Sequence, residues 1–178
     1  MATIQERIKN TIRDVKNFPK EGIVFKDITP ILSDVELSND IVDAVIKDIQ
    51  DKNIQIDAVA CIEARGFLFG TLIAQRLKVP FIPIRKKGKL PYETVSFEYD
   101  LEYGSAIIEM HEDAVQKDWN VLIHDDLLAT GGTAIAAAEL IKLNGKVAGF
   151  SFLVDLAFLE GNKKLKNYSE NVMSLIEY

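Results

Sequence analysis

The sequence predicts an α/β domain, with a mainly parallel twisted sheet flanked by helices. From residue 57 onward, short apolar segments typical of buried strands alternate with longer segments at helical spacing. Strands separated by helices favour parallel pairing, because the chain crosses back over the sheet before each new strand. The 178 residues show no internal repeat, low-complexity tract or linker composition, so we expect a single domain over residues 1–178.

The N-terminal part combines two helices with an irregular stretch. Apolar residues at helical spacing predict a short amphipathic helix over residues 4–15 and a second helix with Ser38 or Asn39 near its start. Residues 18–30 between them show no period but hold too many apolar residues for a simple linker. The positions at helical spacing are Ile4, Ile8, Ile12 and Val15, then Leu37, Ile41, Val45 and Ile49.

Helices and strands alternate through the rest of the chain. Helices are predicted over residues 65–78, 132–144 and 160–167, with Gly145 as the stop signal of the second. Residues 94–113 alternate on both sides of an acidic, glycine-containing turn, which predicts a hairpin. The other predicted strands cover residues 57–63, 79–85, 120–126, 146–157 and 172–178.

Composition limits the class of protein. The chain is 48% hydrophobic, and no apolar run approaches the roughly 18 residues needed to span a bilayer. The N-terminus lacks the apolar stretch of a secretory signal, so we expect a cytoplasmic protein without a membrane partner. A net charge of −6 argues against nucleic-acid binding but allows a small anionic ligand. Cys61 is alone, which excludes an internal disulfide, and its apolar surroundings indicate a core position.

The most informative segment is VLIHDDLLATGGT, residues 121–133. A buried strand runs into Asp125 and Asp126, and a turn of small residues then leads into strong helix formers. Such a turn directs backbone N–H groups and two hydroxyls at the positive end of a helix dipole, where a phosphate binds. The acid pair could accept hydrogen bonds from sugar hydroxyls, so a phosphorylated ribose would satisfy both halves. The turn consists of Ala129, Thr130, Gly131, Gly132 and Thr133.

Simpler interpretations of this segment are weaker. The acid pair lies too early to cap the next helix, for which Thr130 or Gly131 is the better position. The turn is neither a Walker loop nor a dinucleotide fingerprint, because neither motif occurs in the chain. Ligands of parallel sheets bind beyond the carboxyl ends of the strands, and the loops 63–66, 85–90 and 125–133 each follow a predicted strand. We therefore expect these loops to form a single site.

Residues 121–133 resemble the 5-phosphoribosyl-1-pyrophosphate (PRPP) signature of the type I phosphoribosyltransferases. From end to end the chain is similar to the adenine phosphoribosyltransferases of that family. The other matching segments stand in the family's order: FPKEGIVFKDITPIL, then IEARGFLFG, then IRKKGKLPYETVSFEYDLEYG. Two positions depart from the pattern, because His124 stands where an aliphatic residue is frequent and Lys26 where an arginine is common.

The resemblance implies a reaction, a fold and partners. The 5-phosphoribosyl group of PRPP is transferred to adenine, which yields AMP and pyrophosphate, with Mg²⁺ as cofactor. PRPP and water are expected to hold the ion, without a protein metal cage, because Mg²⁺ dehydrates reluctantly. The implied fold adds a small N-terminal hood, formed largely by residues 1–35, and a flexible loop at residues 90–102 that closes over the substrates. A homodimer is also implied.

The resemblance assigns roles that agree with the chemistry. Breaking the bond from ribose C1′ to pyrophosphate leaves positive character on the sugar and negative charge on the leaving group, so positioning and electrostatics should dominate catalysis. Residues 129–133 are assigned to the 5-phosphate, Asp125 and Asp126 to the ribose, and Arg65 to pyrophosphate and catalysis. An arginine at a helix start opposes the helix dipole, which itself indicates that an anion binds there.

The segment RKKGK, residues 85–89, is the second candidate for anion binding. Alone it is most simply a solvated basic turn, but in the family this loop meets pyrophosphate, partly across the dimer interface. The resemblance therefore assigns Arg85, Lys86 and Lys89 to pyrophosphate, together with Tyr103. Glu102 resembles the catalytic glutamate that accepts or relays the purine proton, although periodicity alone favours an exposed acid at a hairpin turn.

Adenine binding is assigned by resemblance to Val24, Phe25 and Lys26 in the hood. Backbone groups read the purine there, so lysine can replace arginine without changing the base. A lone aromatic such as Phe25 would otherwise be interpreted as a core residue. One alternative is a related enzyme for hypoxanthine, guanine or xanthine. Another is a regulator that senses PRPP without catalysis, which is disfavoured because such proteins add a DNA-binding domain and the chain has no spare residues for one.

Overall fold

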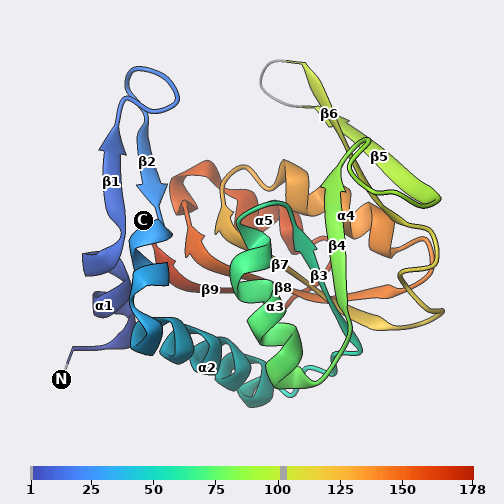
Figure 1. Cartoon of the computed structure of the whole chain (residues 1–178), viewed down its shortest axis with the longest axis horizontal. Coiled ribbons are helices and arrows are strands. Elements are labelled where there is room, and N and C mark those ends of the chain that lie inside the picture. The colour runs from blue at the N-terminus through green and yellow to red at the C-terminus, as the bar shows by residue number, and fades with distance from the viewer. Residues whose placement is uncertain (1, 101–103) are drawn as a thin grey trace.

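The structure, a computed structural model, describes residues 2–100 and 104–178. Within them, the central sheet has seven strands: β3 (Ala58–Ile62), β4 (Phe81–Lys86), β5 (Thr94–Asp100), β6 (Ser105–His111), β7 (Asn120–Leu128), β8 (Lys146–Asp155) and β9 (Val172–Glu177). Their order is β5-β6-β4-β3-β7-β8-β9 (Figure 1). The pairs β4–β3, β3–β7, β7–β8 and β8–β9 are parallel, and β6 runs antiparallel to β4 and β5. The expected α/β fold with a mainly parallel sheet is confirmed.

Helices cover both faces of the sheet. Alternate residues of β3 lie in two separate core clusters, with Val59 and Cys61 in one and Ala58, Ala60 and Ile62 in the other. Both faces of the strand are therefore buried, which explains its continuous apolar sequence. The first cluster packs under α1 (Ile4–Thr11), α2 (Val35–Asp51) and α3 (Gly66–Leu77), and the second under α4 (Gly132–Ile141) and α5 (Gly161–Leu165).

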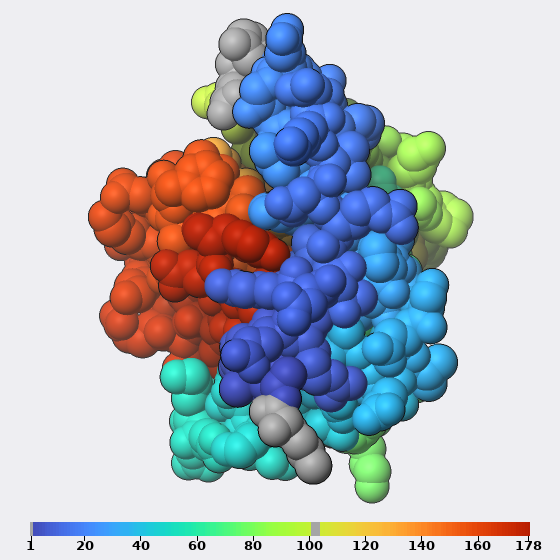
Figure 2. Space-filling view, turned by 90° about the vertical axis from the view of Figure 1, so that its left-hand side faces the viewer, coloured from blue at the N-terminus to red at the C-terminus, as the bar shows by residue number. Residues whose placement is uncertain are grey.

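The N-terminal segment forms a separate hairpin of β1 (Arg13–Lys16) and β2 (Val24–Asp27), followed by a short 3-10 helix over Thr29–Ser33. In Figure 1 this hairpin rises on the left of the molecule and the β5–β6 hairpin rises on the right. Figure 2 shows the N-terminal segment packed over the C-terminal end of the chain. The segment expected to form the hood thus stands beside the sheet and not within it.

The prediction of a helix over residues 4–15 is wrong at its C-terminal end. α1 begins with a capping box between Thr3 and Glu6 and ends at Thr11. Val15 lies in β1, opposite Phe25 of β2. Pairing with β2 in a hairpin overrides the helical spacing at this position. The same pairing gives regular structure to part of the stretch that showed no period.

The start of α2 also differs from expectation. Asp34 is the N-cap, and its carboxylate accepts the N–H of Leu37 at 2.8 Å. Ser38 lies inside the helix, where its hydroxyl donates to the carbonyl of Ile31. The segment contains several residues able to cap, and local sequence does not decide among them.

The other predicted helices and strands are confirmed in kind, and most are shorter than predicted. β7 instead extends to Leu128 and β4 to Lys86, beyond their predicted ends. The predicted hairpin is formed by β5 and β6, paired from Thr94 opposite His111 to Asp100 opposite Ser105. α4 ends at Ile141, whose carbonyl accepts the N–H of Gly145 at 2.8 Å. Within the described ranges, no helix combines the length and apolar character required to cross a membrane.

Candidate active site

Three loops meet where β3, β4 and β7 end. The carboxylate of Glu63, just after β3, accepts a 2.6 Å hydrogen bond from Nε of Arg85 near the end of β4. Nε of Arg65 lies 3.1 Å from Oδ2 of Asp126 in β7. A Cβ on Gly66 would lie only 2.9 Å from Oδ1 of Asp125, so the loop after β3 packs closely against the acid pair. The structure thus brings together the three loops selected from the sequence.

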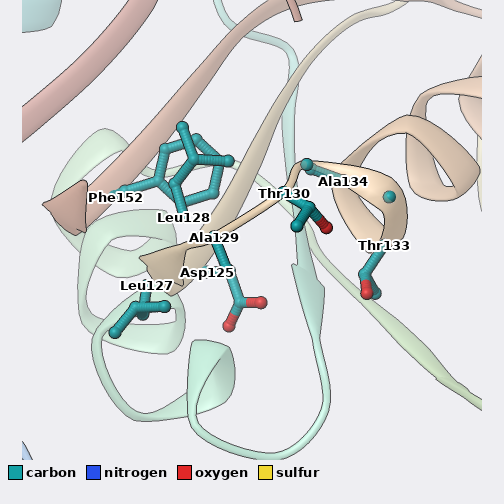
Figure 3. Close-up of a pocket in the computed structure, with 10 residues that line it drawn as sticks. Asp125, Leu127, Leu128, Ala129, Thr130, Thr133, Ala134 and Phe152 are labelled. Carbon is teal, nitrogen blue, oxygen red and sulfur yellow. The ribbon is translucent and has the colours of Figure 1, made fainter. Parts of the chain in front are cut away.

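The turn after β7 encloses a cavity of about 90 Å³ (Figure 3). Gly131 is the N-cap of α4, with a φ of 84° that suits glycine, and it has no side chain to cap the helix. The first N–H groups of α4 therefore face no side-chain cap and suit an anion. In Figure 3 the Asp125 carboxylate projects from the strand on the side away from the Phe152 ring. The cavity is lined by Asp125, Leu127, Leu128, Ala129, Thr130, Gly131, Gly132, Thr133, Ala134 and Phe152.

The N-terminus of α5 packs against the backbone of this turn. A Cβ on Gly161 would lie 2.2 Å from the carbonyl oxygen of Ala129, so a larger residue would push the turn away. Nζ of Lys164 donates to the carbonyl of Thr130 at 3.2 Å. Neither residue was predicted to belong to the site, because the pattern of residues 160–167 indicates only a polar helix. A glycine at a helix start is the available signal, since glycine permits close backbone contact.

Asp125 and Asp126 are neighbours with different surroundings. Asp126 is 2% exposed, whereas Asp125 is half-buried and lines the cavity. Burial raises the pKa of the Asp125 carboxyl well above its ordinary value, and the adjacent Asp126 raises it further. Burial also raises the pKa of Asp126, although the Arg65 guanidinium opposes that shift. Two partly desolvated carboxylates of this kind are suited to accept hydrogen bonds from hydroxyl groups.

Arg65 connects the acid pair to the hood. It is the N-cap residue of α3, and its guanidinium forms an ion pair with Asp126. Their contact is poorly aligned, because Nη1 of Arg65 and Oδ2 of Asp126 are buried without a hydrogen-bond partner in the described part of the chain. The guanidinium also lies over the ring of Phe25, 4.9 Å from its centroid. Arg65 therefore retains capacity to bind a further group.

The basic loop is held by an acidic residue. The Glu63 carboxylate accepts hydrogen bonds from Arg85 and from the N–H of Lys86 at 3.1 Å. Burial works against ionisation, but these hydrogen bonds leave the pKa of Glu63 below its ordinary value. Arg85 also donates through Nη1 to the carbonyl of Lys89. The side chains of Lys86 and Lys89 are exposed. Arg85 is thus fixed in place, while the two lysines extend into solvent.

The side chains of Phe25 and Lys26 point to different neighbours. Phe25 faces Arg65, whereas Nζ of Lys26 lies 2.7 Å from Oδ1 of Asp14 and 3.9 Å from the centroid of the Tyr178 ring. The Lys26 side chain is therefore engaged within the hood and with the C-terminal residue. Next to it is a pocket of about 560 Å³ lined by Gly22, Ile23, Val24, Lys26, Leu156, Phe158, Leu159 and Tyr178.

A contact that the sequence did not indicate joins the β5–β6 hairpin to the start of α4, at the turn after β7. The hydroxyl of Tyr99 in β5 lies 3.1 Å from Oγ1 of Thr133. The Tyr99 ring also packs close to Gly132. In sequence Tyr99 is one alternating residue of a hairpin, and its position depends on packing between β5 and α4. Two expected site residues, Glu102 and Tyr103, lie outside the described residues.

His124 and Cys61 are core residues next to the site. Nδ1 of His124 is 3.3 Å from the Ser151 hydroxyl, and burial lowers the pKa of the imidazole to about 4. Cys61 is fully buried, as expected, and burial raises the pKa of its thiol. Among the residues that the structure describes, no three histidine, cysteine or acidic side chains are grouped to hold a metal ion.

Comparison with known proteins supports one family. The model of the phosphoribosyl transferase domain matches residues 31–171. The adenine phosphoribosyltransferase of Cytophaga hutchinsonii is 53% identical over 176 residues, which are 98% of this chain and 96% of the relative. The crystal structure of the Thermoanaerobacter pseudethanolicus adenine phosphoribosyltransferase matches with a TM-score of 0.93 at 48% identity, covering 99% of this chain and 100% of that one. The Saccharomyces cerevisiae enzyme, complexed with an imino-altritol bisphosphate and adenine, matches with a TM-score of 0.92 at 37% identity, covering 99% and 100%.

The chain belongs to the phosphoribosyltransferase family. Within that family its full-length similarity is to adenine phosphoribosyltransferases, so the resemblance identified in the sequence is confirmed. The family domain, residues 31–171, includes the acid pair and all three loops but excludes Val24, Phe25 and Lys26. The hood is matched only by the relatives that span the whole chain.

Proposed function

We propose that the chain transfers the 5-phosphoribosyl group of PRPP to adenine and releases AMP and pyrophosphate, a purine-salvage reaction. The observation that carries this proposal is the order of features at the end of β7. A desolvated acid pair is followed directly by a cavity at the N-terminus of α4. The acids suit sugar hydroxyls and the cavity suits a phosphate, which together describe a phosphorylated ribose.

In this proposal residues 129–133 bind the 5-phosphate through backbone N–H groups and the two threonine hydroxyls. Asp125 and Asp126 accept hydrogen bonds from the ribose hydroxyls. Donors placed there would favour the ionised carboxylates, so sugar binding would lower the raised pKa of Asp125. Ribose binding would therefore relieve an unfavourable feature of the folded chain.

The leaving pyrophosphate would meet four cations: Arg65, Arg85, Lys86 and Lys89. The guanidinium of Arg65 is next to the acid pair that holds the ribose, and the basic loop is linked to the same region through Glu63. This charge would stabilise the pyrophosphate as the bond to C1′ breaks. Tyr103 would assist there, and Glu102 would accept or relay the proton from adenine N9.

Adenine would bind beside the hood, at Val24, Phe25 and Lys26. Support comes from the Lys26 side chain, which is engaged by Asp14 and Tyr178 and leaves its backbone to contact the base. This arrangement is compatible with a lysine at a position where the family resemblance implies that arginine is common. The Phe25 ring lies over Arg65, so a stacked base would be close to the cation that receives the pyrophosphate.

We propose Mg²⁺ as the cofactor, held mainly by PRPP oxygens and water. The carboxylates of Asp125 and Asp126 are oxygen donors of the kind that Mg²⁺ accepts, so they fit an ion with this coordination. When bound, the ion would neutralise charge on the diphosphate of PRPP. We also propose a cytoplasmic homodimer in which the basic loop lies at the subunit interface, so that Arg85 can also reach the pyrophosphate of the neighbouring subunit.

Base selectivity tests the proposal. The protein is incubated with PRPP, Mg²⁺ and equal concentrations of adenine, hypoxanthine, guanine or xanthine, and nucleotide formation is followed by chromatography. AMP should form faster than any other product, by at least about 100-fold, because a site built to pair with one purine edge rejects another. Faster formation of IMP, GMP or XMP would exclude the adenine assignment. No product from any base would favour a non-catalytic regulator instead.

A further inference from the structure

A buried carboxylate on β6 has no role in the site described above. Glu109 is 4% exposed although it carries a charge. It lies opposite Arg85 of β4 on one side and Ser96 of β5 on the other, and Figure 1 shows β6 between these two strands. Acidic side chains are rarely buried unless their charge is compensated. The contacts of Glu109 should therefore reveal what it does.

The carboxylate holds the backbone of the basic loop. Oε1 accepts hydrogen bonds from the N–H groups of Gly88 (3.0 Å), Lys89 (3.2 Å) and Leu90 (3.2 Å). The Thr94 hydroxyl is 3.5 Å from Oε2, at the limit of a hydrogen bond. Gly88 has a φ of 83°, a conformation that helps successive N–H groups to converge on one anion. All of these partners are uncharged, so Glu109 is compensated by backbone dipoles and not by lysine side chains.

The same loop is held on its other side by Glu63. Glu63 accepts hydrogen bonds from Arg85 and from the N–H of Lys86. The peptide groups of Lys89 link the two sides, because its N–H donates to Glu109 and its carbonyl accepts from Arg85. The side chains of Lys86 and Lys89 are left exposed. Two carboxylates thus fix the loop without neutralising its lysines.

We propose that Glu109 is a positioning residue for pyrophosphate. It fixes residues 88–90 so that Arg85, Lys86 and Lys89 present their charges in a single orientation. Cations in a short loop repel one another, and a loop without this anchor would lose entropy when it closed on pyrophosphate. This inference rests on the proposed role of the basic loop in binding pyrophosphate.

Glu109→Gln tests the inference, because it keeps the shape of the side chain and removes its charge. The two main quantities are the hydrogen exchange of the amides of residues 88–90 and the KM for pyrophosphate in the reverse reaction from AMP. We expect exchange to be at least about tenfold faster and the KM for pyrophosphate about tenfold higher. The kcat at saturating pyrophosphate and the KM for AMP should stay within about twofold, since AMP contacts other loops. Glu112→Gln, an exposed carboxylate just after β6, is the matched control and should leave both quantities unchanged.

The outcomes are distinguishable. Unchanged exchange in Glu109→Gln would overturn the inference, because the loop would not depend on this carboxylate. A Lys86→Ala, Lys89→Ala variant measures the loop's own contribution to the KM for pyrophosphate. If that variant raises the KM while Glu109→Gln does not, the positioning role is wrong and the loop's role stands. If the lysine variant also leaves the KM unchanged, the proposed role of the loop fails and the inference fails with it. A parallel loss of kcat and AMP binding in Glu109→Gln would indicate general structural damage and would also overturn it.

Discussion

Asp125 lies at the carboxyl end of β7 with the buried Asp126 beside it. Its carboxyl pKa is raised by burial and by that neighbouring charge. The folded-state pKa is therefore above the unfolded value, so at neutral pH the ionised carboxylate destabilises the fold. This unfavourable contribution to stability disappears as the pH falls from the folded-state pKa to the ordinary aspartate value. In that range the folded protein binds a proton at Asp125 while the unfolded chain does not. Ribose hydroxyls would supply the missing donors.

Asp125→Asn should therefore stabilise the protein and weaken substrate binding. At pH 8 we expect the midpoint of thermal unfolding to rise by about 2–4 °C, equivalent to roughly 1 kcal/mol. The difference from wild type should shrink towards pH 4, where the native carboxyl is protonated. The KM for PRPP should rise by at least about tenfold. Scanning calorimetry across this pH range and initial-rate kinetics measure the two effects.

The exposed Asp113 provides the control, because Asp113→Asn makes the same chemical change away from β7. It should alter neither the midpoint nor the KM. A lower midpoint for Asp125→Asn at pH 8 would contradict the pKa argument. An unchanged KM for PRPP would contradict the ribose role.

At the scale of single residues, sequence reasoning worked where a motif has a local cause. The acid pair and the glycine turn are adjacent in the chain, and the structure places Asp125 and the turn at one cavity. Arg65 was assigned by resemblance, with its charge at a helix start as a second signal, and the structure places it beside Asp126. Glu109 and Gly161 could not be assigned in this way. Their contacts are with loops distant in sequence. No local pattern distinguishes Glu109 from an ordinary strand acid, and the position of Gly161 at a helix start indicates a close backbone contact without naming the partner.

The β5–β6 hairpin is the element that connects the sheet edge to the phosphate turn. Tyr99 in β5 reaches Thr133 at the start of α4 through a hydroxyl contact of 3.1 Å. Thr133 is one of the residues proposed to bind the 5-phosphate. The hydroxyl of Tyr99 thus orients a proposed ligand-binding group without lining the cavity itself.

Tyr99→Phe should weaken PRPP binding with little effect on folding. Loss of one hydrogen bond is worth about 1 kcal/mol, which corresponds to about a fivefold rise in the KM for PRPP. Tyr168→Phe is the matched control, since it removes the hydroxyl that donates to Glu139 at 2.6 Å outside the lining of the cavity. The control should lower the free energy of unfolding and leave the KM unchanged. Equal KM values in the two variants would show that Tyr99 does not orient Thr133.

At the scale of elements, prediction succeeded for segments whose own sequence determines their structure. α3 and the strands buried on both faces carry continuous patterns, and the structure confirms them. β1 and β2 were missed because each has only four residues and both are stabilised by pairing with each other. Strands of that length do not establish a period, and helical spacing in α1 continued by chance into β1.

The whole molecule assembles the candidate site from segments spread over most of the chain. The sheet order places β3 between β4 and β7, so the loop after β3 contacts both neighbours: Glu63 meets Arg85, and Arg65 meets Asp126. The alternation of strands and helices predicts a parallel sheet, but it does not determine which strands are neighbours. That order depends on how the helices pack on each face. The convergence of the loops was predictable only as a general property of strand ends in parallel sheets.

α3 carries two partly exposed leucines that suit the contact of the proposed homodimer. Leu68 and Leu72 lie one turn apart on this helix and are 38% and 40% exposed. Val35, the first residue of α2, is also exposed, at 73%. Exposed apolar side chains grouped at helical spacing are typical of interfaces between subunits. We therefore assign the proposed dimer contact to the outer face of α3.

Leu72→Glu should convert the protein to a monomer. A buried, unpaired charge at an interface typically costs several kcal/mol, which is enough to shift the dimer dissociation constant by at least about 100-fold. Sedimentation velocity at micromolar concentration measures the mass of the species. Leu143→Glu is the control, because Leu143 is 59% exposed after α4, on the helix layer that covers the opposite face of the sheet from α3. If Arg85 serves the neighbouring subunit, the monomeric variant should also lose affinity for pyrophosphate, whereas Leu143→Glu should keep both mass and affinity. A Leu72→Glu protein that sediments as wild type would place the contact elsewhere, and a monomeric wild type would contradict the dimer itself.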